Sequence, residues 1–356
     1  MEEMEKALTH EATRHEDAQR HHHHSHGPAS HHAGGHHLLQ VEDLSISFLM
    51  YEGQKGQKGT VLVSRDASRR RFFRAQKQEV PVICNLNISV HVGEIVAVVG
   101  ASGAGKTLLA DAIMGVFQPN ALVSGRIWFD GAAQDAQSLA KLRGRGISLV
   151  PQSTACLDPL MRVGEQVRGF RGGRASRRLA QSELFARYGL DEEVGRLRPF
   201  EVSGGMARRV LLASALIDQP KLIIADEPTV GLDLDLAVRA LSDFREFADL
   251  GKGVLLITHD IELALRVGDR VAVFKDGTVV EETAVESFAS PDLLAHPFSK
   301  ELWHALPEHD FAVPGHPHPS LGHGVAALKS EAAVLPAMSS PPSLSEAAQE
   351  EGAKPC

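Results

Sequence analysis

Short apolar runs alternate with amphipathic stretches through the middle of the chain. The first runs, residues 38–48, 80–90 and 95–100, are rich in Val, Ile and Leu and predict strands. Later runs are continuous rather than alternating, which is typical of strands buried on both faces by crossover helices. These runs are ISLV (147–150), LIIAD (222–226), VLLIT (254–258) and VAVF (271–274). The pattern therefore predicts a mostly parallel α/β sheet.

The hydrophobic pattern changes in three other parts of the chain. At about residues 153–210, arginine-rich helical stretches occur without strand-like runs, so we expect a helical insertion there. Residues 1–37 and 307–356 have neither apolar periodicity nor enough apolar side chains to form a core. We therefore predict one folded domain, residues 38–306, between two disordered ends.

The composition is that of an ordinary globular protein. The chain has 356 residues, 43% of them hydrophobic, and a formal net charge of −8, so it has no general attraction to nucleic acid or anionic lipid. Its three cysteines lie far apart and form no CxxC pair, which indicates a reduced, cytosolic protein. No apolar run approaches the roughly 18 residues needed to cross a bilayer. We therefore expect another chain to bring this one to any membrane.

Residues 53–78 stand where a short turn would join two early strands. The segment contains the arginine cluster SRRRFFR. An extended, solvated hairpin is the simpler interpretation, and a contact of the arginines with phospholipid or a partner protein is the alternative.

The stretch GASGAGKT, residues 100–107, follows the strand IVAVV directly and matches G-x-x-x-x-G-K-[ST]. Glycines permit a tight loop whose backbone N–H groups surround phosphate oxygens, and the following helix adds a favourable dipole. We expect Lys106 to reach the β- and γ-phosphates of a nucleotide and Thr107 to bind Mg²⁺. The predicted phosphate-binding residues are Gly100, Ala101, Ser102, Gly103, Ala104, Gly105, Lys106, Thr107 and Leu108.

A second motif, LIIADEPT, ends a continuous apolar strand in two carboxylates. At the carboxyl edge of a buried parallel strand, Asp226 can hold the hydration shell of Mg²⁺. Glu227 comes next to the place where water attacks the γ-phosphate, and it can orient and deprotonate that water. The sequence therefore predicts that Glu227 is the catalytic base.

The segment FEVSGGMARR, residues 200–209, resembles the signature segment of ATP-binding cassette (ABC) proteins. Ser203 is able to cap the helix that begins there, and the amides of Gly204 and Gly205 can approach a γ-phosphate. In the ABC family the signature of one cassette closes over the glycine-rich loop of another. The resemblance therefore implies that a second ATPase subunit, identical or related, completes each ATP site.

Other positions match the same family in the expected order. Gln152 in VPQS corresponds to the Q-loop, Asp233 in VGLD to the D-loop, and His259 in ITHD to the switch histidine. The resemblance implies that Gln152 senses Mg²⁺ and a membrane partner, and that His259 contacts the γ-phosphate and the attacking water. Catalysis would then depend on Glu227, His259, Lys106 and Gln152.

Two departures from the family pattern concern details of the ATP site. Val202 and Met206 stand where LSGGQ is commoner, so one side-chain hydrogen bond of the signature is lost. Phe48 fits the spacing of the aromatic residue that stacks on adenine. Tyr51, Phe72 and Phe73 stay open as alternatives because the 53–78 segment follows.

The resemblance implies an α/β P-loop NTPase (RecA-like) fold with an N-terminal antiparallel β subdomain and an α-helical insertion. It is strongest to the ATP-binding subunits of nickel and oligopeptide or dipeptide importers, through PFEVSGGM, IIADEPT and HPFSKELWHALP. Because the cysteine-rich C-terminal segment of many oligopeptide-type members is missing, nickel is favoured over peptide. Such a subunit would lie peripherally on the cytoplasmic face of the membrane, bound to permease subunits that receive cargo from an extracytoplasmic binding protein.

Eleven of the 19 histidines fall within the first 37 residues. Imidazoles at this density bind nickel, zinc or copper without any biological need. Three interpretations stay open: a buffer or sensor for Ni²⁺ or Zn²⁺, a neutral low-complexity extension, and a remnant of engineering.

Two rival functions come from other classes. A soluble ABC ATPase acting on DNA or ribosomes is disfavoured because the sequence shows no coiled-coil insertion, tandem cassette or zinc-finger cysteines. A metal-storage protein with a degenerate cassette conflicts with the intact Lys106, Glu227 and His259. The sequence thus predicts an ABC importer ATPase that uses ATP and Mg²⁺ and binds no nucleic acid.

Overall fold

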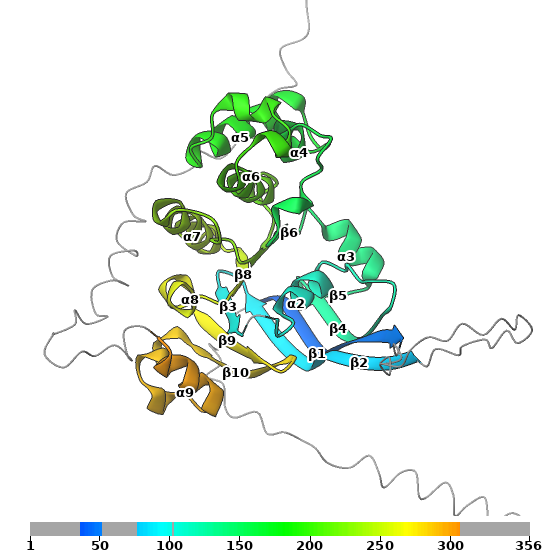
Figure 1. Cartoon of the computed structure of the whole chain (residues 1–356), viewed down its shortest axis with the longest axis vertical. Helices are drawn as coiled ribbons and strands as arrows, with labels where there is room; N and C mark the ends of the chain where they lie inside the picture. The colour runs from blue at the N-terminus through cyan, green and yellow to red at the C-terminus, as the bar shows by residue number, and fades with distance from the viewer. Residues whose placement is uncertain (1–35, 52–76, 102, 307–356) are drawn as a thin grey trace, which may run out of the picture. The chain divides into compact units, whose positions relative to one another are not determined.

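The computed structural model describes residues 36–51, 77–101 and 103–306 (Figure 1). The predicted C-terminal tail, almost all of the N-terminal one, most of the 53–78 segment and Ser102 lie outside these residues. The first strand begins at His37, one residue before the expected domain boundary. The proposed division of the chain into a folded domain and two tails therefore stays a prediction.

An antiparallel sheet forms the first layer. Within the described residues it has the order β2-β1-β4-β5. Strands β1 and β2 pair along their full length, from His37 opposite His91 to Tyr51 opposite Lys77, so the described residues on either side of this gap lie on neighbouring strands. The strands are β1 (His37–Tyr51), β2 (Lys77–His91), β4 (Ala121–Phe129) and β5 (Ala132–Gln134).

A second sheet carries the continuous apolar runs. Its order in the described chain is β10-β9-β3-β8-β7-β6, and all neighbours are parallel except β9 and β10. Every residue of β3, β7 and β8 is buried, because helices or the other sheet cover both faces. The strands are β3 (Ile95–Gly100), β6 (Ile147–Val150), β7 (Leu222–Asp226), β8 (Gly253–Thr258), β9 (Arg270–Lys275) and β10 (Thr278–Ala284).

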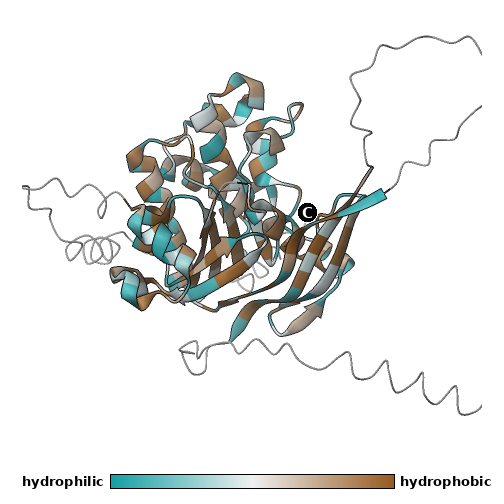
Figure 2. Cartoon of the chain, turned by 60° about the horizontal axis from the view of Figure 1, so that its bottom comes forward, coloured by the Kyte–Doolittle hydropathy of each residue, from teal (hydrophilic) through white to brown (hydrophobic). Residues whose placement is uncertain are grey.

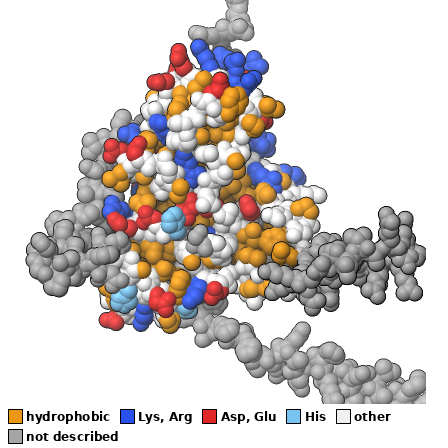
Figure 3. Space-filling model, viewed as in Figure 1, with side chains coloured by type: hydrophobic (Ala, Val, Ile, Leu, Met, Phe, Trp, Pro, Cys, Tyr) orange, Lys and Arg blue, Asp and Glu red, His pale blue; other side chains and the backbone are white. Residues whose placement is uncertain are grey.

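Helices connect the strands and cover the parallel sheet. The stretch between β6 and β7 holds only helices in the described chain, and basic side chains gather over its outer end in Figure 3. The α-helices are α2 (Lys106–Ile113), α3 (Ala136–Leu142), α4 (Val163–Arg168), α5 (Arg174–Arg187), α6 (Gly204–Leu216), α7 (Leu234–Asp249), α8 (Ile261–Val267) and α9 (Pro297–His304). The short 3₁₀ turns are Thr154–Cys156, Glu192–Arg196, Pro199–Glu201, Val285–Ala289 and Pro291–Leu293.

Alternate residues of β3 face different parts of the core, as the period of two of a strand requires. Val96 and Val98 pack into the apolar layer that holds α2 and the antiparallel sheet, whereas Ala97 and Val99 pack with residues of α8 and α9. Figure 2 shows the strands of both sheets as largely hydrophobic ribbons. The parallel sheet is therefore a rigid, dry support for the loops at its carboxyl edge.

The predicted fold class is confirmed, with both the antiparallel layer and the helical insertion present. Three strands were not predicted: β4, β5 and β10. β4 exposes most of its first residues, and every residue of β10 is half-buried, so neither has a continuous apolar run or a clean alternation. No helix among the described residues is long and apolar enough to cross a membrane.

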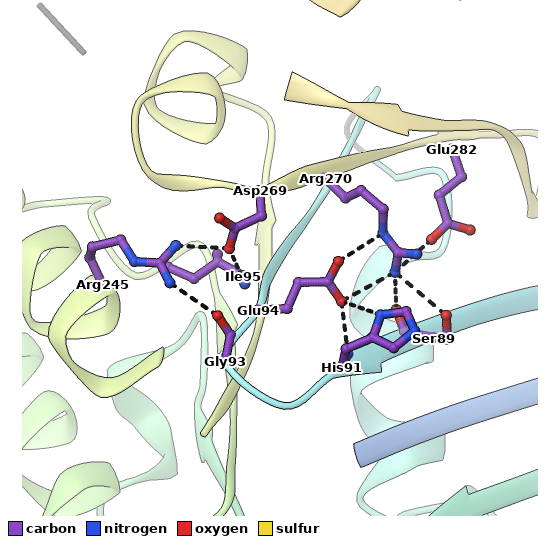
Figure 4. A network of polar contacts seen from close by, with 9 residues as sticks. All are labelled: Ser89, His91, Gly93, Glu94, Ile95, Arg245, Asp269, Arg270 and Glu282. Atoms are coloured by element: carbon purple, nitrogen blue, oxygen red, sulfur yellow. Dashed lines mark hydrogen bonds and ion pairs between the residues drawn. The ribbon is translucent and has the colours of Figure 1, made fainter. Parts of the chain in front are cut away.

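Ion pairs join the strands at the amino edge of the parallel sheet (Figure 4). Arg270, the first residue of β9, pairs with Glu94 at 3.1 Å and with Glu282 of β10 at 2.9 Å. Arg245 of α7 pairs with Asp269 at 2.8 Å, and the same carboxylate accepts a hydrogen bond from the Ile95 amide. This network fastens α7, β3, β9 and β10 at the edge opposite the predicted ATP site.

Candidate active site

The glycine-rich loop follows β3 at the carboxyl edge of the parallel sheet. A Cβ built on Gly100 would lie 2.1 Å from the carbonyl oxygen of Phe274 on β9, so only glycine fits where the loop leaves the sheet. Gly105, the N-cap of α2, has φ of 104° and no side chain with which to cap the first-turn amides. Those amides and the helix dipole suit an anion such as phosphate.

Lys106 is the first residue of α2, and its side chain is buried. Its Nζ donates hydrogen bonds to the carbonyl oxygens of Gly100 at 2.8 Å and Ala101 at 2.9 Å. Burial lowers the pKa of Lys106, while the nearby charges of Glu227 and Asp226 oppose that shift. The ammonium group thus lies within the loop, close to the carboxylates of Asp226, which ends β7, and Glu227, which follows it.

Two of the three predicted magnesium-binding residues, Thr107 and Asp226, meet beside the loop, and no hydrogen bond joins the side chain of the third, Gln152, to either of them among the described residues. Asp226 is the last residue of β7, is buried, and forms a side-chain hydrogen bond with Thr107 of α2. Burial raises the pKa of Asp226, the hydrogen bond with Thr107 opposes this, and the neighbouring Glu227 charge adds to it. A carboxylate with a hydroxyl at its side is an oxygen donor set that suits Mg²⁺.

The predicted base contacts Thr258, the last residue of β8, and His259, the residue that follows it; β8 lies between β3 and β7. The carboxylate of Glu227 accepts hydrogen bonds from the backbone N–H of His259 at 3.0 Å and from the hydroxyl of Thr258 at 3.3 Å. The ring Nδ1 of His259 lies 2.8 Å from the same carboxylate. Glu227 is buried and His259 is exposed, so the pair connects the interior to the surface of the site.

Sequence reasoning missed Thr258. Its hydroxyl donates a hydrogen bond to the carboxylate of Glu227 and brings no charge of its own, so it holds the carboxylate without neutralising it. Its only signal was its place in ITHD, directly before His259. A cavity of about 450 Å³ opens beside Glu227, Thr258 and His259 and continues along the start of α7. It gives the carboxylate access to solvent.

The signature segment forms a separate group. Ser203 caps α6, as predicted, by accepting a hydrogen bond from the Met206 amide at 3.2 Å. A Cβ built on Gly204 meets nothing within 4 Å among the described residues, and one on Gly205 meets only the Gly231 carbonyl oxygen. In Figure 1, α6 lies with α4 and α5, away from α2. Within one chain Ser203 and Gly204 are thus exposed, Gly205 is half-buried, and α6 lies apart from the helix that follows the glycine-rich loop.

Among the residues that the structure describes, the other predicted site residues form no contact with those above that would test their predicted roles. Asp233 caps α7 through a 3.0 Å hydrogen bond from the Leu236 amide, and Gln152 is exposed after β6. Phe48 is half-buried against the same apolar cluster as Ala104 and Leu108, so its predicted contact with adenine stays a prediction. Ser102 lies outside the described residues. No metal-binding group of three or more His, Cys, Asp or Glu side chains occurs in the described part of the chain.

Comparisons with known proteins agree with this arrangement. Residues 83–230 match the family model described as ABC transporter. The oligopeptide transport ATP-binding protein OppD of Lactococcus lactis subsp. cremoris is 32% identical over 271 residues, covering 68% of this chain and 77% of the relative. The OppD of Bacillus subtilis is 31% identical over 331 residues, covering 86% of this chain and 85% of the relative.

Solved structures of ABC proteins are also similar to this chain. The ATP-binding cassette MJ0796, a dimer in a post-hydrolysis state with ADP and phosphate bound, is 26% identical with a TM-score of 0.56, over 69% of this chain and 98% of that one. CbiO1 of Clostridium perfringens, part of an ABC transporter complex, is 26% identical with a TM-score of 0.53, over 75% of this chain and 98% of that one.

Proposed function

The chain belongs to the ABC transporter family as an ATP-hydrolysing cassette, and from that premise we propose that it drives an importer for oligopeptides or dipeptides. The observation that carries the catalytic part is the convergence of Lys106, Asp226, Glu227 and His259 at the carboxyl ends of three neighbouring strands. Each group has a role in phosphoryl transfer to water.

We assign those roles from the contacts. The bound Mg²⁺–ATP would supply the electrophilic phosphorus and the charge that draws these groups together. Glu227 takes the proton of the attacking water, and Thr258 and His259 hold its carboxylate in place. Lys106 and the first-turn amides of α2 bind phosphate oxygens, and Asp226 with Thr107 holds the metal.

A second subunit is part of the proposal. Ser203 and Gly204 are exposed and apart from the chain's own glycine-rich loop, so they are free to face the nucleotide of another cassette. A dimer, of two copies or with a related subunit, would place ATP between them. We propose that its closure moves permease subunits docked near Gln152 on the cytoplasmic face of the membrane.

The cargo is the part on which sequence and comparisons differ. The sequence favoured nickel, with peptides as the alternative. The two curated relatives reported above are named as oligopeptide transport proteins. A dipeptide transport ATP-binding protein of Bacillus subtilis is 33% identical over 65% of this chain and 72% of the relative. These names support the peptide alternative.

The test compares two cargoes in cells that lack this chain. Cells complemented with the wild type or with Lys106→Ala receive a labelled tripeptide and, in parallel, radioactive nickel. We expect the wild type to restore tripeptide uptake, Lys106→Ala to restore none, and nickel uptake to be the same in all strains. Restoration of nickel uptake alone would overturn the peptide proposal.

For the histidine-rich segment we propose, as from the sequence, that it buffers or senses Ni²⁺ or Zn²⁺. Of its residues, His36 and His37 are described: His36 pairs with Asp130, and His37 stacks on His91 at 4.4 Å between ring centroids. Deletion of residues 1–35 should lower the Ni²⁺ stoichiometry of the purified protein and change its metal-dependent ATPase activity. If neither changes, the segment is no metal buffer.

A further inference from the structure

Arg208 of α6 is a buried arginine next to the backbone of Glu227, only 2% exposed. Its guanidinium donates to backbone carbonyl oxygens that lie in two loops. After β6 it reaches Pro151 at 2.5 Å and Gln152 at 2.9 Å. After β7 it reaches Pro228 at 3.2 Å and the carbonyl of Glu227, with a longer contact to Asp226.

The absence of a carboxylate among these acceptors is unusual for a buried charge. In the described residues, no hydrogen bond or ion pair joins Arg208 to an acidic side chain, and the charges of Asp226 and Glu227 act on it only through space. A planar guanidinium with five N–H donors is the side chain suited to hold several carbonyls at once. Its geometry is therefore matched to backbone, not to a counter-ion.

One of those carbonyls belongs to a residue in a costly conformation. Glu227 has φ of 48°, in the left-handed region that non-glycine residues rarely adopt. The backbone N–H of Glu227 donates to the carbonyl oxygen of Ile257 at 2.8 Å, and the carbonyl oxygen of Glu227 accepts from the Arg208 guanidinium. These two bonds hold the peptide groups on either side of Glu227, and this backbone is what directs its carboxylate toward Thr258 and His259.

We propose that Arg208 is a positioning residue for hydrolysis: it holds the strained backbone of Glu227 and joins it to the Gln152 loop and to α6. The inference rests on the proposed role of Glu227 as the base. Since Ser203 begins the same helix, any displacement of α6 moves the Arg208 guanidinium and, with it, both loops.

The test is Arg208→Ala, with Arg208→Gln as a second variant that keeps two N–H donors. We expect kcat to fall about 10- to 100-fold in Arg208→Ala, as for loss of charge-assisted hydrogen bonds, while the Kd for ATP changes by less than about threefold. Arg208→Gln should retain an intermediate kcat. Millimolar ethylguanidinium should restore part of the Arg208→Ala rate, and ethylammonium should not.

Arg143 supplies the matched control. Its guanidinium also donates to backbone carbonyls, Met114 at 2.7 Å and Gly115 at 2.6 Å, but at the far end of α2. Arg143→Ala should lower the Tm without changing kcat and should show no rescue. If Arg208→Ala behaves in the same way, its role is only structural and the proposal fails.

A further variant separates this inference from the proposed function. In a Glu227→Gln background, Arg208→Ala should have little further effect on the rate, because both changes remove the same step. Full additivity of the two losses would overturn the link between Arg208 and Glu227. If the wild type itself released no phosphate, the proposed function would fail instead.

Discussion

The two edges of the parallel sheet treat buried charge in different ways. At the amino edge each arginine has carboxylate partners: Arg270 contacts Glu94 and Glu282, and Arg245 contacts Asp269 (Figure 4). Such a network neutralises its own charges and fastens strands to helix α7. It needs no ligand to be complete.

At the carboxyl edge the two buried cations are held by backbone carbonyl oxygens. Lys106 and Arg208 donate to backbone carbonyls, while Glu227 accepts from a hydroxyl and a backbone amide and lies 2.8 Å from the ring Nδ1 of His259. Among the described residues, Lys106 has no bonded carboxylate, so its charge is available for an anionic ligand. The comparison indicates that the partners of a charge, more than its burial, distinguish the amino edge from the edge that we propose to be catalytic.

The largest expected effect comes from making the same change, glutamate to glutamine, at each of the two edges. Glu227→Gln should lower kcat by roughly 10²- to 10⁴-fold, the usual contribution of a general base, while ATP-driven dimerisation persists. Glu282→Gln, at the amino edge, should leave kcat unchanged. Phosphate release and size-exclusion chromatography with ATP measure both. Equal losses of kcat would show that the two edges do not differ in this way.

A second, smaller effect concerns the cations. Lys106→Met should weaken ATP binding about 10- to 100-fold, as expected for loss of a charged donor to phosphate, with little change of Tm. Arg270→Met should lower the Tm, since it leaves Glu94 and Glu282 without their partner, and should leave the Kd for ATP unchanged. Fluorescent-nucleotide titration and thermal unfolding distinguish these outcomes.

The smallest effect is a pH dependence at the amino edge. Burial raises the pKa of Glu282, and Arg270 opposes the shift without cancelling it. The folded protein therefore binds this proton more tightly than the unfolded chain, and ionised Glu282 costs stability as the pH rises above the ordinary glutamate value of 4.5. The Tm of Glu282→Gln relative to wild type should thus be higher at pH 7.5 than at pH 5. A constant difference would contradict the raised pKa.

The strands that could be predicted are those buried on both faces of the sheet. The runs ending at Gly100, Val150 and Asp226 coincide with β3, β6 and β7, because strands covered on both faces need apolar side chains at most positions. β4 and β10 were missed because each has partly exposed residues along its length. Their pairing depends on neighbours far away in the chain.

By itself, the sequence determined which chemical groups follow which strands, and it predicted their roles in the site. A glycine-rich turn after a strand, a strand ending in Asp226 and Glu227, and a histidine after an apolar run each follow from local rules of backbone and charge. Only the tertiary structure decided which side chains hold which. Arg208 and Thr258 contact Glu227 because separate strands and α6 converge at one edge, and hydrogen bonds between residues 19 or 31 positions apart leave no local pattern.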